Sequence, residues 1–311
     1  MKYIKMFAVV ILSLSFLSCG TTQRNYRITL IDRGNNSFWE SVYNGALEAA
    51  SVNNVNLTLL SPQNYDYEEQ ISLLRSSISD KPDAIILAAL NSEQLVKPVE
   101  EAALAKIPLI VIDSAINSDK WISFIASDNK KIGETIADEI VNRSSKPGKV
   151  GVISYSKSSS AAVERVEGLN EAFGRTSGFL PLDAFYSGTD IESSEAITEQ
   201  MVKDNPDIVA IACFSGYVTV GAGRALENLD RTDILLAGVD CNYEGVDMMA
   251  LGILDFTVLQ NTFQMGYYAV ENAVRHLSGR NVDQNINTGF YIVDKDNMLD
   301  DEIQRILFPF S

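Results

Sequence analysis

Polar side chains with planar hydrogen-bonding groups follow several short apolar runs of this chain, at the points where the runs end. Asp113 and Gln260 directly follow such runs, and Asp240 comes two residues after a third. The residues that we single out, including two adjacent aromatic ones, are Asn36, Phe38, Trp39, Asp113, Arg165, Ser215, Asp240 and Gln260. Hydrogen bonds to charged groups contribute about 1.5–3 kcal/mol each, and aromatic faces pack against the C–H surface of a sugar. These residue types together therefore suit a polyhydroxylated ring.

The elements that must position these residues alternate regularly between strand and helix. Short apolar runs indicate buried strands, and apolar spacings of three and four indicate helices. The predicted strands are 27–31, 55–60, 83–87, 108–112, 149–153, 182–185, 208–212, 234–238 and 255–259. The predicted helices are 37–52, 67–79, 92–106, 130–143, 161–173, 192–203, 218–229, 243–251 and 262–277.

This alternation predicts an α/β fold with mostly parallel sheets that helices cover on both faces. Two doubly wound units fit the length better than one sheet of ten strands, and helix 262–277 could belong to either unit. Ligands of such folds bind beyond the carboxyl ends of the strands. We therefore expect the selected polar residues to line one cleft between the two units.

The amino terminus has the pattern of an export signal. Lys2 and Lys5 precede an apolar run, 6–17, and Cys19 follows a small residue. The run is too short to span a membrane permanently. We expect residues 1–19 to act as a lipoprotein signal peptide, with Cys19 lipidated after cleavage; the alternative is an ordinary secretory peptide with an incidental cysteine. Either way the protein is exported to the cell envelope, and a lipid anchor would hold it at a periplasmic face or at the cell surface.

Composition excludes some classes of function. The net charge of −16 argues against a nucleic-acid partner, because phosphates require clusters of Lys and Arg. Cys213 and Cys241 are expected to be free thiols, because a chain of 311 residues has core enough without a disulfide. His276 is the one histidine, so we predict no metal site and no cofactor.

Several segments resemble the ribose- and galactose-binding branch of the type I periplasmic binding proteins, and their order and spacing carry the resemblance across 26–293. The segments are Asn35-Asn36-Ser37-Phe38-Trp39, Ile107 to Asp113, Ile125-Ala126-Ser127-Asp128-Asn129, Ser160 to Arg165, Gly238-Val239-Asp240 and Thr257-Val258-Leu259-Gln260. The resemblance implies two Rossmann-like lobes joined by a three-stranded hinge. It implies chain crossings near Asp128, Gln260 and Asn287. The N-terminal lobe would comprise 26–127 plus 261–287, and the C-terminal lobe 128–260 plus 288–311.

The resemblance also implies a set of sugar contacts. They are Asn36, Asp113, Arg165, Asp240 and Gln260, with Phe38 and Trp39 on either side of the ring. Ser114 stands where ribose binders usually have Arg, and Ser215 where they usually have Asn. Because both departures remove hydrogen-bond donors, another pentose, a hexose, a sugar alcohol or a furanose-like signal molecule fits as well as ribose.

Structural interpretations of the same residues remain open in the sequence. Asp113 could form a turn, Arg165 could lie on a solvated helix face, and Asp240 could cap the following helix. Asp113 and Asp240 could also form the carboxylate pair of a glycosidase. Against this, no carboxylate has a sequence setting that indicates a raised pKa, and a nearby Arg165 would lower the pKa instead.

The function that the resemblance implies is that of a substrate-binding lipoprotein of a bacterial ABC importer. It would be a monomer that binds a monosaccharide or sugar-like solute by hinge closure, delivers it to a membrane permease and catalyses nothing. The first alternative is a receptor that reports ligand to a sensor kinase or chemoreceptor. The second is an exported glycoside or nucleoside hydrolase. The effector domain of a transcriptional repressor is a third, which the export signal and the missing DNA-binding segment disfavour.

Overall fold

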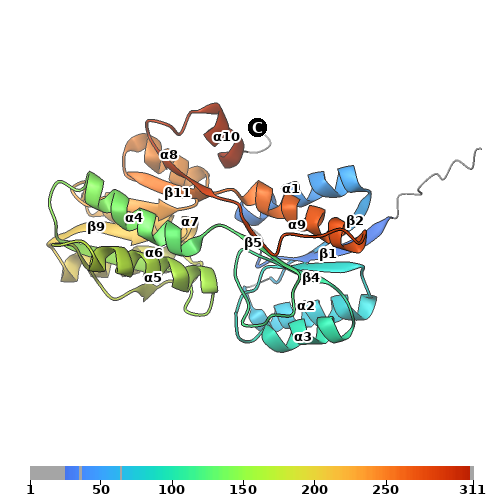
Figure 1. The fold of residues 1–311 in the computed structure, drawn as a ribbon. Coiled ribbons are helices and arrows are strands. Elements are labelled where there is room, and N and C mark those ends of the chain that lie inside the picture. The colour runs from blue at the N-terminus through green and yellow to red at the C-terminus, as the bar shows by residue number, and fades with distance from the viewer. Residues whose placement is uncertain (1–24, 35–36, 64, 309–311) are drawn as a thin grey trace, which may run out of the picture.

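The protein folds into two α/β lobes, seen side by side in Figure 1. The computed structural model describes residues 25–34, 37–63 and 65–308. The predicted signal peptide, Cys19 and Asn36 lie outside the described residues. The fold class predicted from the sequence, two doubly wound lobes with a three-part connection, is confirmed.

The first lobe contains a six-stranded sheet in the order β12-β5-β4-β3-β1-β2, and all of its strand pairs are parallel. Its strands are β1 (Tyr26–Ile31), β2 (Val55–Leu60), β3 (Ala84–Leu87), β4 (Leu109–Ile112), β5 (Ser123–Ala126) and β12 (Asn285–Asn287). Its helices are α1 (Ser37–Asn53), α2 (Tyr67–Asp80), α3 (Val96–Leu104) and α9 (Thr262–Leu277). Helices α1 and α9 bury their apolar sides in one core cluster, and α2 and α3 bury theirs in another. Helix α9 therefore belongs to the first lobe.

The second lobe contains a seven-stranded sheet in the order β13-β11-β10-β9-β6-β7 with β8 paired to β6. Its strands are β6 (Lys149–Ser154), β7 (Leu180–Pro181), β8 (Phe185–Tyr186), β9 (Ile208–Cys213), β10 (Leu235–Val239), β11 (Phe256–Gln260) and β13 (Phe290–Asp294). Its helices are α4 (Asn129–Arg143), α5 (Ser160–Gly174), α6 (Ile191–Asp204), α7 (Gly216–Asn228), α8 (Tyr243–Leu251) and α10 (Asp301–Leu307). Strand β13 runs antiparallel to β11, and the other pairs are parallel.

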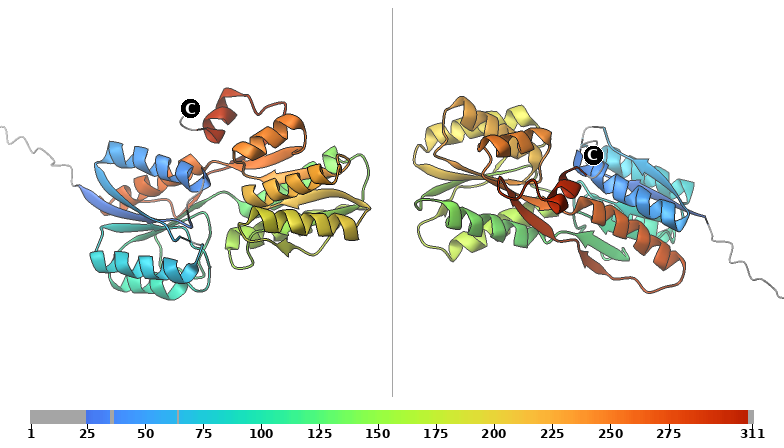
Figure 2. Two further views of the ribbon diagram at one scale, coloured as in Figure 1. Left: turned by 180° about the vertical axis from the view of Figure 1, so that it is seen from behind. Right: turned by 90° about the horizontal axis from the view of Figure 1, so that it is seen from above.

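The chain passes between the lobes three times, after β5, after β11 and after β12. Figure 2 shows these crossings at one side of the gap between the lobes. Two crossings are tied together, because the Ser127 hydroxyl donates to the carbonyl of Gly289 at 2.8 Å and lies 3.2 Å from the Thr288 hydroxyl. The division of the strands between the two sheets supports the proposed lobe boundaries, 26–127 plus 261–287 and 128–260 plus 288–311.

Some elements differ from the prediction. The helix predicted over 92–106 begins only at Val96, because 92–95 form turns. Most of the strand predicted over 182–185 is absent, because residues 182–184 lie between the short strands β7 and β8 and only Phe185 is in a strand. Strands β5, β12 and β13 and helix α10 were not predicted. Strand β12 and helix α10 are short, whereas β5 and β13 are as long as strands that were predicted.

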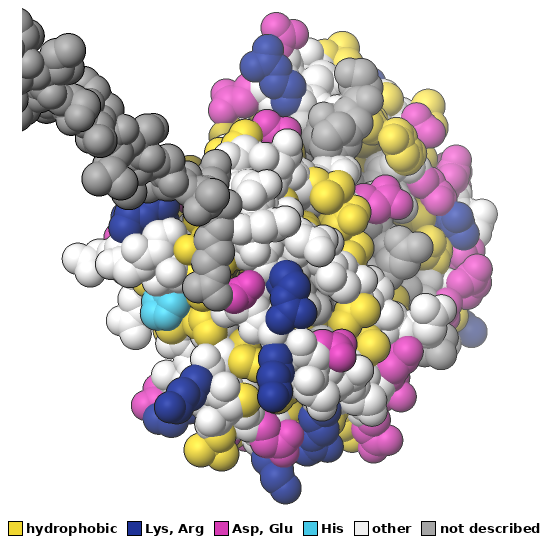
Figure 3. Space-filling view, turned by 90° about the vertical axis from the view of Figure 1, so that its right-hand side faces the viewer, with side chains coloured by type: hydrophobic (Ala, Val, Ile, Leu, Met, Phe, Trp, Pro, Cys, Tyr) yellow, Lys and Arg dark blue, Asp and Glu magenta, His cyan; other side chains and the backbone are white. Residues whose placement is uncertain are grey.

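Figure 3 shows the outer end of the first lobe, where acidic and basic side chains are intermixed. Within the described residues, no helix combines the length and the apolar character needed to cross a membrane.

Candidate ligand-binding site

A pocket of about 670 Å³, including its mouth, lies between the lobes at the carboxyl ends of the strands. Its lining includes all the site residues predicted from the sequence that the structure describes: Phe38, Trp39, Asp113, Arg165, Ser215, Asp240 and Gln260. The first three come from the first lobe, and the others come from the second lobe or from the crossing at the end of β11. The fold thus brings together residues that are more than 200 positions apart. That they contact a ligand is a proposal.

Asp113 and Asp240 occupy equivalent positions in the two lobes. Each follows a central strand, β4 or β10, and each has a positive φ, 63° and 60°. The backbone N–H of Asp113 donates to Ile125 O at 3.0 Å, and that of Asp240 donates to Val258 O at 2.9 Å. Aspartate tolerates this left-handed conformation better than most residues. The kink ends the strand and directs each carboxylate into the pocket.

Gln260 holds the Asp240 carboxylate in place. Its backbone N–H donates to Oδ1 of Asp240 at 3.1 Å, and its Nε2 donates to Oδ2 at 2.7 Å. The Oε1 atom of Gln260 is buried and has no hydrogen-bond partner in the structure. A buried acceptor without a donor is costly, so this atom is suited to receive a ligand hydroxyl.

The electrostatics of Asp240 differ from the expectation. Burial raises the pKa of Asp240 above its usual value, and Arg165 and Gln260 only oppose this rise. The expectation that a nearby Arg165 would lower the pKa overall was therefore wrong for Asp240, since burial outweighs it. Segments distant in the sequence enclose Asp240, and for that reason no local sequence setting indicated the rise. The cap of α8 is Asn242, whose Oδ1 accepts from Gly245 N at 2.9 Å, so the capping role considered for Asp240 is also wrong.

Arg165 is buried, with 2% of its surface exposed, although it lies on a helix. Its Nε donates to Oδ1 of Asn129 at 2.8 Å, and its Nη1 donates to the carbonyl of Phe214 at 3.0 Å. The alternative of a solvated helix face is thus wrong. Ser215 lines the pocket but also caps α7, since its Oγ accepts from Val218 N at 3.4 Å.

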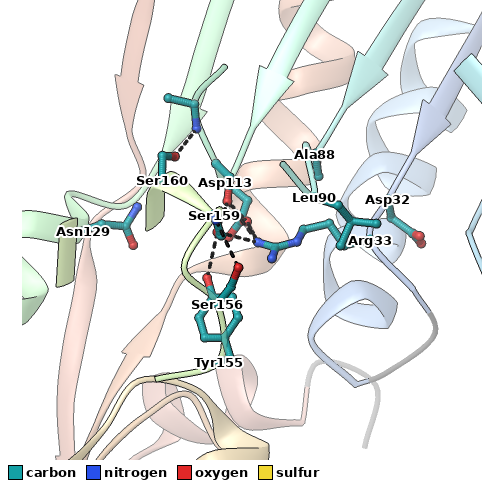
Figure 4. A network of polar contacts seen from close by, with 12 residues as sticks. Asp32, Arg33, Ala88, Leu90, Asp113, Asn129, Tyr155, Ser156, Ser159 and Ser160 are labelled. Atoms are coloured by element: carbon teal, nitrogen blue, oxygen red, sulfur yellow. Dashed lines mark hydrogen bonds and ion pairs between the residues drawn. The ribbon is translucent and has the colours of Figure 1, made fainter. Parts of the chain in front are cut away.

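Arg33 is a pocket residue that the sequence analysis did not select. Its Nη1 lies 2.9 Å from Oδ2 of Asp113, 3.0 Å from Oγ of Ser114 and 3.2 Å from Oγ of Ser159 (Figure 4). Its guanidinium carbon lies 5.3 Å from the centre of the Tyr155 ring. Its position in the sequence did indicate a place in the pocket, because Arg33 lies just after β1 as Asp113 lies just after β4. Arg33 supplies a guanidinium beside Ser114, so the loss of donors inferred from Ser114 is at least partly offset.

The aromatic residues form a wall on one side of the pocket. The ring centres of Phe38 and Trp39 are 4.8 Å apart with an interplanar angle of 70°, an edge-to-face contact. No sugar ring fits between them, so the expected sandwich is wrong. Trp39 also packs into the core of the first lobe. On the side of the second lobe, Tyr155 and Tyr217 line the pocket, and the sequence analysis selected neither.

The charged side chains that line the pocket balance. They are two arginines, Arg33 and Arg165, and two aspartates, Asp113 and Asp240. This arrangement suits a neutral solute with many hydroxyl groups better than an anion or a cation. Such groups can discriminate sharply, because a ligand that lacks a hydroxyl leaves a buried partner unpaired.

The structure also bears on the thiols and on metal binding. Cys213 and Cys241 are both free thiols. Burial, with a smaller effect of Asp240, raises the pKa of Cys241 to about 12, so its thiol stays protonated at neutral pH. In the part of the chain that the structure describes, no three His, Cys, Asp or Glu residues cluster as metal ligands would.

The two lobes, their crossings and the polar pocket between them define a class of protein, the two-lobed solute-binding proteins. A family model described as a periplasmic binding protein domain matches residues 28–281. The chain therefore belongs to the periplasmic binding protein family, as its resemblance to the type I, ribose-like branch predicted.

Individual relatives agree with this assignment. The ribose import binding protein of Salmonella typhimurium is 27% identical over 248 residues, which are 80% of this chain and 83% of the relative. The D-allose-binding periplasmic protein of Escherichia coli is 25% identical, over 85% of this chain and 88% of the relative. A solved ABC-transporter solute-binding protein of Agrobacterium vitis, bound to α-D-tagatopyranose, superposes with a TM-score of 0.89 and 26% identity, covering 91% of this chain and 99% of that one. These relatives are binding proteins and not enzymes, which agrees with the prediction of a non-catalytic chain.

Proposed function

We propose that this chain binds a neutral monosaccharide or sugar-like solute in the pocket between its lobes. The observation that carries the proposal is the pair Asp113 and Asp240, one from each lobe, both directed into one pocket that also contains two arginines. The hydroxyl groups of a sugar ring between the two carboxylates would donate hydrogen bonds to acceptors from both lobes at once. Relatives whose names specify ribose, allose or tagatose support a sugar as the ligand.

The same geometry supports hinge closure as the binding mechanism. The lobes touch at one side of the pocket, where Ser92 N donates to Ser158 O at 3.1 Å and Ala115 N donates to Ser160 Oγ at 2.6 Å. A ligand held by both lobes adds contacts that only the closed conformation makes, so it shifts the population toward closure.

In the cell, the protein would act as the substrate-binding lipoprotein of an ABC importer. Cys19 would carry the lipid that holds it at the membrane, and the closed monomer would deliver its ligand to the permease. The names of the relatives, which include an import binding protein and an ABC-transporter solute-binding protein, support the transport role. The lipid anchor rests on the pattern of residues 1–20.

The test is a thermal-shift screen of the unlipidated protein with pentoses, hexoses, polyols and nucleosides. A ligand at a hundred times its Kd stabilises the folded protein by about 2.7 kcal/mol, which raises the melting temperature. Asp240→Ala should abolish this rise, because it removes the acceptor that Gln260 positions. Asp247→Ala, which removes an exposed carboxylate of α8 outside the pocket, is the matched control and should respond as the wild type does.

Arg165→Ala should also abolish the response, but it is a less clean variant. Because Arg165 is buried and bonded to Asn129 and Phe214, its loss leaves two polar groups without a partner and should lower the unliganded melting temperature as well. If no compound raises the melting temperature, or if Asp240→Ala responds fully, the proposed function is wrong.

A further inference from the structure

A second cavity adjoins the pocket. Its volume, including open solvent, is about 890 Å³, against about 670 Å³ for the pocket itself. The two share a common boundary formed by Ser37, Phe38, Asp240, Cys241, Asn242 and Gln260. The space available next to Asp240 therefore exceeds what the pocket alone provides for a single sugar ring.

Three helices form the walls of the second cavity. Glu40 and Asn44 come from α1 in the first lobe, and Tyr243 and Val246 come from α8 in the second. The remaining wall is the end of α10, at 306–308. Figure 1 shows α10 next to α8, on the side of α8 that is nearer to α1. Helix α10 lies beyond residues 28–281, the part of the chain that the family model matches.

Like the pocket, the second cavity combines aromatic rings with hydrogen-bonding side chains, although no arginine is among its lining residues. Tyr243 is 72% exposed, and its ring stacks on Phe308 with ring centres 5.2 Å apart and an interplanar angle of 23°. The stack supports one face of Tyr243 from behind, so the ring can present a rigid aromatic surface. A carboxylate (Glu40) and two amides (Asn44 and Asn242) line the same cavity.

The second cavity does not result from lobes held fully apart. On the side of the pocket near the loop 155–160, the lobes are already joined by hydrogen bonds that Ser158, Ser159 and Ser160 accept from donors in the first lobe. The space near α10 thus remains while the lobes are in contact. At the boundary of the two cavities, Gln260 is 1% exposed and its Oε1 has no partner in the structure. A sugar hydroxyl at this boundary would donate a hydrogen bond to Gln260 Oε1.

We propose that the second cavity is a subsite for a second sugar ring, so that the ligand is a disaccharide or a longer glycoside. One ring occupies the pocket between Asp113 and Asp240, and the next packs against Tyr243 with its hydroxyls facing Glu40 and Asn44. The inference rests on the proposed function and specifies its substrate class.

The experiment compares matched sugars by isothermal titration calorimetry on the wild-type protein. The pairs are D-galactose with lactose and melibiose, D-glucose with cellobiose and maltose, D-xylose with xylobiose, and D-ribose with inosine. The inference predicts that at least one disaccharide binds ten times or more tighter than its monosaccharide. Tyr243→Ala should weaken that disaccharide about tenfold, the loss expected for one aromatic contact, and should change the affinity of the monosaccharide less than twofold.

Two variants control for the ring itself. Tyr243→Phe keeps the aromatic surface and should retain the preference for the disaccharide. Leu251→Ala removes another exposed apolar side chain of α8, 73% exposed and outside both cavities, and should change nothing.

The outcomes separate this inference from the proposed function. If monosaccharides bind and no disaccharide binds tighter, or if Tyr243→Ala weakens both sizes equally, the second subsite is wrong and the proposed function stands. If inosine alone gains over its sugar, the subsite accepts a base and the assignment to a sugar ring is overturned. If no sugar of either size binds, both proposals fail together.

Discussion

At the level of single residues, the loops beside the site are held by hydrogen bonds of a buried glutamine that the sequence pattern does not reveal. Gln70 is completely buried, and its Nε2 donates to the carbonyls of Asp32 and Ala88 at 2.6 and 2.8 Å. Its Oε1 accepts from Leu90 N at 2.9 Å. One glutamine of α2 thus joins the loops after β1 and β3. Because Arg33 follows Asp32 directly, this side chain also helps to place the guanidinium that contacts Asp113.

Asp32 allows a pH-dependent test at the residue scale. Burial raises its pKa from 3.8 to about 6, although the Ser61 hydroxyl and the Gly34 N–H oppose the rise. Between these values the folded protein keeps a proton that the unfolded chain has lost, so the contribution of Asp32 to stability falls as pH rises from about 4 to 6. Asp32→Asn cannot ionise, and its free energy of unfolding should gain on the wild type by up to about 3 kcal/mol between pH 4 and 7.

The measurement is urea unfolding of both proteins at each pH. Asp80→Asn, which changes an exposed carboxylate at the end of α2, serves as the control. A difference between Asp32→Asn and wild type that stays constant with pH would show that Asp32 ionises as it does in an unfolded chain.

Helix pairs meet through glycine at equivalent places in the two lobes. A side chain at Gly45 or Gly266 would collide with the backbone of the facing helix in the pair α1 and α9. In the pair α4 and α5, a Cβ on Gly133 would collide with the carbonyl of Arg165, and one on Gly168 with that of Lys130. These contacts let the helices approach closely, and the second pair sets the position of Arg165.

Gly133→Ala should therefore affect both stability and ligand affinity. The added methyl displaces α5 and with it Arg165, so we expect a lower melting temperature and a ligand affinity at least tenfold weaker in calorimetry. Gly174→Ala is the matched control, because a Cβ there meets nothing within 4 Å and the backbone of Gly174 is helical. Equal affinities for the two variants would show that the close packing of α4 and α5 does not position Arg165.

At the scale of the whole molecule, binding depends on how the lobes meet. The contacts on one side of the pocket join Ser158, Ser159 and Ser160 to the first lobe. The three crossings also connect the lobes (Figure 2). The apparent Kd equals the intrinsic Kd divided by the fraction of closed molecules. Contacts between lobes outside the pocket can therefore change affinity.

Ser160→Ala tests this coupling, because its hydroxyl accepts from Ala115 N in the first lobe and does not line the pocket. Loss of a hydrogen bond of about 0.5–1.5 kcal/mol should weaken binding roughly two- to tenfold. Small-angle X-ray scattering should show a larger radius of gyration without ligand and the wild-type value with saturating ligand. Ser187→Ala, whose hydroxyl donates to Gly188 O in its own lobe, is the control. If Ser160→Ala leaves both scattering and affinity unchanged, closure does not depend on this contact.

Most of the helices and strands, and the general place of the site, could be predicted from the sequence alone. Apolar periodicity marks strands and helices because it reflects which side chains must leave water. The carboxyl ends of parallel strands converge at one edge of a sheet, so residues after the strands, such as Asp113 and Asp240, were predictable pocket residues. Gln260 was predictable in the same way, and the family resemblance favoured a place in the pocket over a solvated helix face for Arg165.

The contacts between these side chains became apparent only in the folded molecule. Arg33 meets Ser159 across 126 positions, Phe38 and Trp39 contact each other instead of enclosing a ring, and α10 returns to form a second cavity. The raised pKa of Asp240 has the same origin, since burial by distant segments desolvates its carboxylate. Desolvation and ring contacts depend on distances in space between groups far apart in the chain. A local pattern contains no such distances, so these features appear only when the lobes are assembled.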